Sequence, residues 1–347
     1  MKIANYITKL KTVNHIHALR IWVLLLLLFS KHSIGQDLHY SQYYNSPLNL
    51  NPALTGANAD YRMVLNTRSQ WKSVTVPYRT YSAAFDMKAI GIGTFHPNTG
   101  VGLMVNSDVD GDSHLRTTNI NFTTGFQQTL DADSINIISI GVLLGYTQKS
   151  FDINGLSFNN QFTGDFFDPT APTGEPVTDD KMGYFDLGIG LHGQLFKNET
   201  RQFQLGVALH HINRAKNSFY NSGNVKIMPR LTAYAHWQQQ VNNVTIIPHL
   251  LYMRQNTLQQ IHFGGHIQWH KFEKVSLLEA GVSYRWADAI VLQTGLGLKN
   301  LYVGLSYDIN ISQLTNASKG RGGFEAALIY KIYKIRPLAP SPPCIIY

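Results

Sequence analysis

Apolar and polar residues alternate along most of this sequence, from about Tyr61 to Tyr333. Within 301–311 the odd-numbered residues are all apolar or aromatic, whereas most of the even-numbered ones are polar or glycine. A strand of this kind has one apolar and one polar face. About fourteen such stretches follow one another, each close to the ~9–11 residues that a tilted strand needs to cross a bilayer. The sequence therefore predicts an all-β fold, a single transmembrane antiparallel β-barrel of about 14 strands.

The alternating stretches define the predicted barrel domain, 61–333. A short segment without alternation, 36–60, precedes it, and a proline-rich tail, 334–347, follows it. The four prolines of the tail exclude a central strand there. The predicted strands lie at roughly 61–71, 79–89, 99–108, 114–128, 135–149, 183–196, 201–212, 229–240, 244–255, 258–270, 275–287, 289–298, 301–311 and 322–333.

Residues 1–35 have the features of a secretory signal. Four basic residues precede an uninterrupted apolar run from Ile21 to Phe29, and small residues follow at Ser33 and Gly35. Because this run is far shorter than the ~20 residues of a spanning helix, a cleaved signal peptide is favoured over an uncleaved anchor. The segment carries five of the 29 Lys and Arg residues and no acid, which leaves 24 bases against 21 acids, or +3 instead of +8. This near-balance removes the main argument for nucleic-acid binding.

The lengths of the connections predict an orientation. Both ends of a bacterial barrel usually lie in the periplasm, so odd-numbered connections face outward and tend to be longer. The longest connection, 152–182, is the fifth, and the long connection 213–227 is the seventh. Even-numbered connections such as 131–133 and 299–300 are short, although the second one, 91–98, departs from the pattern.

A soluble β-sandwich is the alternative fold for an alternating chain. Sandwiches usually contain seven to nine strands, fewer than the number predicted here. Aromatic residues also occur near the ends of several stretches, as expected for the interfacial girdles of a membrane barrel. They are Trp71, Trp237, Trp269, Trp286 and Tyr333.

Two motifs resemble binding loops, but their context favours a structural role. Residues 188–193 match G-x-G-x-x-G, yet they lie within an alternating stretch and not between a strand and a helix, where a dinucleotide phosphate would bind. Residues 108–112 resemble the opening of a calcium loop, but the glycine comes too early and Asn119 replaces the closing glutamate. A polar hairpin tip is the simpler interpretation, and a weak surface cation site stays open.

Three histidines, His262, His266 and His270, recur every four residues on one stretch. On a strand, successive members lie ~13 Å apart and cannot bind one metal ion. A polar row facing the lumen is the simpler interpretation, and a cross-strand contribution from His249 or Glu279 stays open. Because no nucleophile, Cys/His pair or carboxylate pair stands at a convincing spacing, we expect no catalytic residue, no cofactor, no metal site and no enzymatic activity.

The most specific local pattern lies just before and within the first predicted strand. It combines Ser-Gln, Asn-Pro-Ala and a later glycine with two arginines, an asparagine and a Gln-Trp pair. Its residues are His39, Ser41, Gln42, Pro47, Asn51, Pro52, Ala53, Gly56, Arg62, Asn66, Arg68 and Trp71. The pattern resembles the PorP/SprF family of outer-membrane proteins of type IX secretion and gliding-motility systems. The resemblance extends to Phe324, Glu325 and Cys344, but the residues after Cys344 lack the proline and the base that family members often carry.

The resemblance implies a location and a role. The location is the outer membrane of a Gram-negative, Bacteroidota-type cell. The role is a non-enzymatic component of the type IX secretion system that assists the secretion or surface attachment of a client, such as a gliding adhesin recognised through its C-terminal domain. The implied partners are this client, periplasmic secretion-system or peptidoglycan-linked components, and the lipid bilayer. The alternative is a transport channel for small hydrophobic or polar solutes, with an N-terminal hatch. The identity of the client, a role in gliding and the oligomeric state stay open.

The segment 36–60 has two possible placements. Its polar side chains and two prolines suit either a plug inside the lumen, which could simply cap the barrel floor, or a docking strip in the periplasm. Arg62, Asn66 and Arg68 share one face of the first predicted strand, and an arginine facing lipid at mid-depth would cost ~2–4 kcal/mol. We therefore expect these three side chains to face the lumen, where they can pair with the segment.

Overall fold

The computed structural model describes residues 37–72, 76–89, 96, 98–111, 113–131, 136–153, 156–164, 166–175, 180–198, 200–220, 225–270, 275–313 and 315–334. The predicted signal peptide and most of the predicted tail, including Cys344, lie outside these residues.

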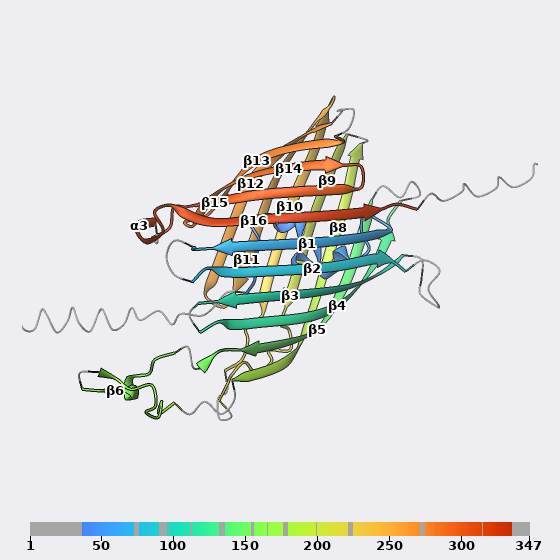
Figure 1. The fold of residues 1–347 in the computed structure, drawn as a ribbon. Helices are drawn as coiled ribbons and strands as arrows, with labels where there is room; N and C mark the ends of the chain where they lie inside the picture. Colours follow the sequence, from blue (N-terminus) through green and yellow to red (C-terminus); the bar gives the residue numbers. More distant parts are fainter. Residues whose placement is uncertain are drawn as a thin grey trace, which may run out of the picture. The chain divides into compact units, whose positions relative to one another are not determined.

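Within the described residues, fourteen antiparallel strands form a closed barrel, which confirms the predicted fold (Figure 1). Neighbours in the sequence pair with each other, and β1 pairs with β16 to close the ring. A separate two-stranded sheet, β6–β7, forms within the connection that joins β5 to β8 in the sequence. The barrel strands are β1 (Tyr61–Gln70), β2 (Tyr78–Lys88), β3 (Thr99–Asp110), β4 (Leu115–Thr129), β5 (Ile137–Ser150), β8 (Lys181–Asn198), β9 (Arg201–His210), β10 (Arg230–Val241), β11 (Val244–Gln255), β12 (Leu258–His270), β13 (Leu277–Arg285), β14 (Ala289–Leu298), β15 (Leu301–Asn310) and β16 (Arg321–Ile332).

The remaining elements are short. Those before the barrel are η1 (Tyr43–Asn45), α2 (Pro47–Leu50) and η2 (Pro52–Leu54), and those in the connections are η4 (Asn159–Gln161), β6 (Phe162–Thr163), β7 (Phe166–Phe167) and α3 (Thr315–Ser318). In the part of the chain that the structure describes, no helix is both long enough and apolar enough to cross a membrane.

The strands place apolar side chains outside and small or polar ones inside. On β5, Ile138, Ile140 and Leu144 are exposed, whereas Ser139 and Thr147, which point to the opposite face of the same strand, are buried. Since successive side chains of a strand point to opposite faces, this arrangement follows directly from the alternation in the sequence. It gives the barrel the apolar outer band that lipid chains solvate and a polar inner wall.

The two ends of the barrel differ in their connections. One end, here called the long-loop end, carries the connections after β1, β3, β5, β9, β11, β13 and β15, including 151–180 and 211–229. The other, here called the short-turn end, carries the two-residue turns 242–243 and 299–300. The barrel also begins and ends at the short-turn end, because Tyr61 opens β1 and pairs with Ile332 of β16. The longest connection at this end is 89–98, the one that departs from the predicted parity.

Candidate functional site

Residues 38–60, here called the lumenal segment, lie against the inner wall of the barrel (blue in Figure 1). The segment forms short turns because Pro47 and Pro52 open α2 and η2, where a missing backbone N–H is harmless. The Asn51 side chain accepts a hydrogen bond from the Ala53 N–H at 2.8 Å and so caps η2. Most of the segment is buried despite its many polar side chains, so its polar groups need partners in the wall.

Leucines and tyrosines of the segment form small apolar clusters with the wall. Leu50 and Leu54 pack with Tyr43, Tyr234 and Leu251. A second cluster joins Leu48 of the segment to Met104 and Leu143. Because burial of a leucine side chain contributes roughly 1.5–3 kcal/mol, the segment supplies apolar contacts that a polar, hydrated lumen would lack.

Four charged side chains from four strands hold the segment near the long-loop end. They are Arg68 of β1, Arg285 of β13, Asp308 of β15 and Glu325 of β16, here called the long-loop anchor. Arg68 pairs with Glu325 at 2.6 Å and with Asp308 at 3.1 Å, and Arg285 pairs with Asp308 at 2.7 Å. All four side chains are buried, so two cations and two carboxylates balance each other away from water.

Ser41 inserts the segment into this anchor. Its backbone N–H donates to Glu325 at 2.7 Å, and its hydroxyl donates to Asp308 at 2.8 Å. The same hydroxyl accepts from Arg285 at 2.8 Å. The backbone N–H of Gln42 donates to the second Glu325 oxygen at 3.0 Å. Charge-assisted hydrogen bonds of this kind are about twice as strong as neutral ones, so the anchor holds the backbone itself.

A second ion pair holds the segment near the short-turn end. Arg62 contacts both oxygens of Asp86 through Nε and Nη2, each at 2.8 Å, and Nη2 also donates to the Leu54 carbonyl at 2.8 Å. The N–H of Gly56 donates to Asp86 at 2.7 Å. Gly56 adopts a φ of +70°, a left-handed conformation that favours glycine. The segment thus runs along the lumen from the long-loop end at Leu38 to the short-turn end at Asp60.

Between the two anchors, Tyr43 and Tyr44 lie among histidines of the wall. The ring of Tyr44 stacks on His266 with centroids 4.9 Å apart, and Tyr43 packs edge-on against His249 at 5.7 Å. The Tyr43 hydroxyl lies within hydrogen-bond distance of His236 Nε2, at 3.2 Å. The histidines of the wall therefore provide both polar and aromatic contacts for the segment.

Glycines in the wall let the Asn51-Pro52-Ala53 turn approach closely. A Cβ atom at Gly141 of β5 would collide with the backbone of Pro52 and Ala53, and one at Gly190 of β8 would collide with the Asn51 amide. The Asn51 amide donates to the Leu191 carbonyl of β8 at 2.8 Å. A wall without side chains at these positions is what allows this backbone contact.

Gly141→Ala tests this contact. The backbone of Pro52 and Ala53 cannot rotate away as a flexible side chain could, so we expect the free energy of unfolding to fall by about 1–3 kcal/mol. Urea unfolding of the barrel in detergent measures this change. The matched control is Gly193→Ala in β8, because a Cβ there meets only ordinary van der Waals contacts. Equal effects of the two substitutions would contradict a specific contact with the segment.

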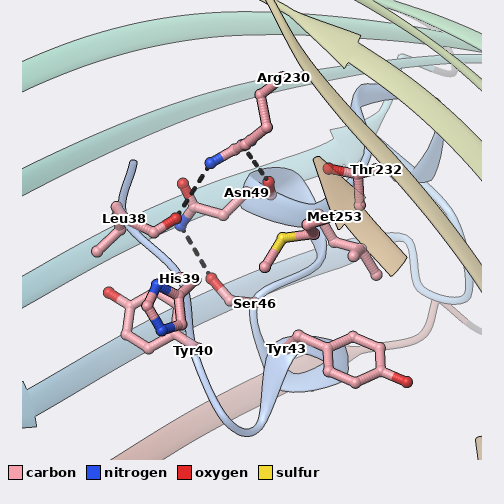
Figure 2. A pocket seen from close by; sticks show the side chains of 10 residues that line it. Leu38, His39, Tyr40, Tyr43, Ser46, Asn49, Arg230, Thr232 and Met253 are labelled. Carbon is pink, nitrogen blue, oxygen red and sulfur yellow. Dashed lines mark hydrogen bonds between the residues drawn. The ribbon is translucent and has the colours of Figure 1, made fainter. Parts of the chain in front are cut away.

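A small cavity remains between the segment and the wall near the long-loop end (Figure 2). Arg230 of β10 donates across it to the Leu38 carbonyl at 3.1 Å and to the Asn49 carbonyl at 3.4 Å. The volume of the cavity is about 20 Å³, enough for one water molecule. His39, Tyr43 and Met253 line it together with other residues of the segment and of β10. The cavity is therefore too small for a solute or a peptide.

The structure brings most residues of the sequence signature together. The segment contributes His39, whose carbonyl accepts from Arg68 at 2.9 Å, and the wall contributes Asn66, whose amide donates to the Asn45 carbonyl at 3.2 Å. Trp71 stands apart, because it follows β1 at the long-loop end and its ring contacts Tyr78. The signature residues inside the lumen are His39, Ser41, Gln42, Pro47, Asn51, Pro52, Ala53, Gly56, Arg62, Asn66 and Arg68.

The acidic residues of the site and the cationic Arg285 are not part of any local sequence motif. Asp86, Asp308 and Arg285 lie outside the signature pattern, and Glu325 is connected with it only through the family resemblance. A signal was present: each is an ionisable residue at an inward position of a spanning strand, where charges are expensive and usually have a specific partner.

The other motifs lie in the wall. Residues 188–193 are part of β8, as the alternation indicates, and Asp108 and Asp110 end β3 directly before the hairpin turn that begins at Gly111. The Thr80 hydroxyl donates to Asp108 at 2.5 Å. His266 lies 3.9 Å from Glu279, across the β12–β13 pair. In the described part of the chain, no group of three or more His, Cys, Asp or Glu side chains is placed to hold a metal ion.

Comparisons with known proteins agree with this architecture. The toluene transporter TodX of Pseudomonas putida has a TM-score of 0.50 at 10% identity over 82% of this chain and 93% of its own. The CymD monoaromatic hydrocarbon channel has a TM-score of 0.48 at 9% identity over 84% of this chain and 93% of its own. At 10% identity the likeness to TodX shows the barrel fold alone. No curated protein sequence matches the chain.

The family comparison is more specific. The model of the type IX secretion system membrane protein family PorP/SprF matches residues 32–330, which include the whole lumenal segment and nearly all of the barrel. This match confirms the resemblance drawn from the signature residues, and with the barrel fold it supports an outer-membrane location. The chain belongs to the PorP/SprF family of type IX secretion system membrane proteins.

Proposed function

We propose that this protein assists the secretion or surface attachment of one client of the type IX secretion system, recognised through the client's C-terminal domain. The main support is the family match over residues 32–330, since the family consists of secretion-system membrane proteins and not of enzymes. The lumenal segment adds support, because a barrel occupied by its own chain is suited to binding a partner at its ends. Periplasmic secretion-system or peptidoglycan-linked components would bind at the short-turn end.

The proposal includes an orientation. Outer-membrane barrels usually carry their longer loops outside the cell and their short turns in the periplasm. The long-loop end would then face the client, and the lumenal segment would act as a plug that runs from the outer mouth to the periplasmic floor. In this orientation Leu38, which is bound by Arg230, lies at the outer mouth.

Thr257→Cys tests the orientation in intact cells. On a Cys344→Ser background, we expect a membrane-impermeant maleimide to label Cys at position 257, because this residue is exposed in the turn between β11 and β12 at the long-loop end. The control is Asn300→Cys in an exposed turn at the short-turn end, which we expect to be labelled only after the cells are broken. The reverse pattern would contradict the orientation.

The second candidate function is a transport channel with an N-terminal hatch, for which the barrel and its lumenal segment are also suited. In this function, the segment would move away from the inner wall to let a solute pass. Conductance of the purified protein distinguishes the two functions: a reproducible open pore in the wild-type barrel would favour the channel.

Deletion of the gene, followed by surface proteomics, tests the secretion role directly. We expect one client, or a small set, to disappear from the cell surface and to return when the wild-type gene is restored. Unchanged surface display of every type IX client would overturn the proposed function, whereas loss of all clients would indicate a role in the general secretion machinery.

A further inference from the structure

The connection 151–180 at the long-loop end carries a small hairpin with exposed phenyl rings. Phe162 of β6 pairs with Phe167 of β7, and their ring centroids lie 5.3 Å apart on one face. Phe166 is 69% exposed, Phe162 54% and Phe167 40%. Aromatic rings exposed together on a polar loop are typical of a surface that binds another molecule.

The hairpin has internal hydrogen bonds that hold these rings in place. The buried Gln161 side chain accepts from the Phe158 N–H at 3.0 Å and donates to the Ala171 carbonyl at 3.3 Å. The Asp168 N–H donates to the Gln161 carbonyl at 2.8 Å. At the base of the connection, Phe151 packs edge-on against Phe219 of the neighbouring connection. The exposed rings thus belong to a defined hairpin.

The charge of this connection specifies the partner. Residues 151–180 contain six acids and no Lys or Arg, whereas the chain as a whole has more Lys and Arg than Asp and Glu. Hydrogen bonds from the Thr170 hydroxyl and N–H hold the pKa of Asp168 below its usual value, so this carboxylate stays charged. A field of this sign attracts cationic groups and repels an anionic lipid surface. Phenyl rings also bind the cationic side chains of Arg and Lys on their faces.

We propose that the β6–β7 hairpin and the acidic residues around it bind a basic polypeptide segment that carries aromatic or aliphatic side chains. The rings would bury the apolar side chains of this segment, and the carboxylates would pair with its cations. The inference rests on the proposed function in one respect: the segment would belong to the secreted client, which meets the long-loop end outside the cell.

Binding of synthetic peptides to the full-length protein in uncharged nanodiscs tests the proposal. The probe is a short fluorescent peptide in which Arg and Tyr alternate with Ser, and the comparison peptides carry Glu in place of Arg or Ser in place of Tyr. We expect the Arg/Tyr peptide to bind, with an affinity that falls as salt is added, and each comparison peptide to bind about tenfold more weakly. Equal binding of the Glu/Tyr peptide would overturn the proposal.

Two variants locate the binding. Phe162→Ser combined with Phe166→Ser and Phe167→Ser is expected to weaken the Arg/Tyr peptide about tenfold, which corresponds to 1.4 kcal/mol. Glu175→Lys with Asp180→Lys leaves the rings in place and is expected to weaken binding and reduce its salt dependence. The matched control is Tyr220→Ser with Val225→Ser, two exposed residues of the neighbouring connection. Because heating unfolds a folded barrel and slows its migration on SDS gels, this shift shows that each variant is folded. Wild-type affinity in the triple variant would overturn the proposal, as would binding of anionic lipid vesicles in preference to the peptide.

Surface display separates this inference from the proposed function. If the triple variant loses both the peptide and the surface client, both are supported. If the peptide binds through the hairpin but the triple variant still displays the client, the binding surface stands and its assignment to the client fails. Gene deletion could remove the client while the triple variant still binds the peptide and still displays the client. In that case the secretion role stands and the hairpin proposal fails.

Discussion

Replacement of residues 39–56 by a Gly/Ser linker of equal length is expected to convert a barrel without measurable current into one that opens in steps. The replaced residues supply Tyr43, Leu48, Leu50 and Leu54, the apolar side chains that pack inside the lumen against residues of the wall. Without them the lumen would be lined by the polar inner face of the strands, which water can hydrate. A linker of Gly and Ser would make no comparable apolar contacts with the wall.

Single-channel recording in planar bilayers measures this effect. The control replaces residues 156–175 of the longest connection with the same type of linker, which we expect to leave the current unchanged. The altered segment directly precedes β1, so its replacement could disturb closure of the barrel. Heat-dependent migration on SDS gels therefore first shows whether the barrel still closes. A folded barrel that stays silent after the segment is replaced would contradict its role as a plug. Large currents in the wild-type protein would contradict it as well.

Asp308→Asn is expected to lower the free energy of unfolding by about 3–5 kcal/mol. Asp308 is the carboxylate that both Arg68 and Arg285 contact, and its side chain is 2% exposed. The substitution leaves two buried guanidinium groups with one carboxylate fewer, and an uncompensated buried charge is costly. It also removes the charge from the acceptor of the Ser41 hydroxyl, so the segment loosens together with the wall.

Urea unfolding of the barrel in detergent measures the loss of stability. Asp168→Asn, the same chemical change on an exposed connection, is expected to stay within about 0.5 kcal/mol of the wild type. A double variant, Asp308→Asn with Arg285→Gln, removes one cation as well and is expected to be more stable than the sum of the two single effects predicts. Additive effects would contradict a coupled anchor.

The strands were predictable because their signal is local. The expected ranges 244–255, 258–270 and 289–298 coincide with β11, β12 and β14, and most other boundaries differ by one or two residues. A period of two follows from the geometry of an extended chain next to lipid, so no distant contact is needed to produce it. The hairpin β6–β7 was not predicted, because its strands of two residues are too short to show any period.

The candidate site was predictable only in part. Arg62 and Arg68 were expected in the lumen because a charge facing lipid is expensive, and this reasoning needs only the phase of the strand. Their partners require knowledge of which strands meet. Arg62 pairs with Asp86 on the next strand, but Arg68 pairs with Asp308 and Glu325 only because the last strands close onto the first.

The sequence by itself determined a membrane barrel, its strands and the unusual segment before them, because alternation and prolines act through the local backbone. Tertiary structure alone decided where that segment lies. Ser41 and Asp308 are separated by 267 positions in the sequence and by 2.8 Å in space. Closure of the barrel makes the lumen a confined, water-poor space, and only there do an otherwise ordinary serine, two arginines and two carboxylates become a buried anchor.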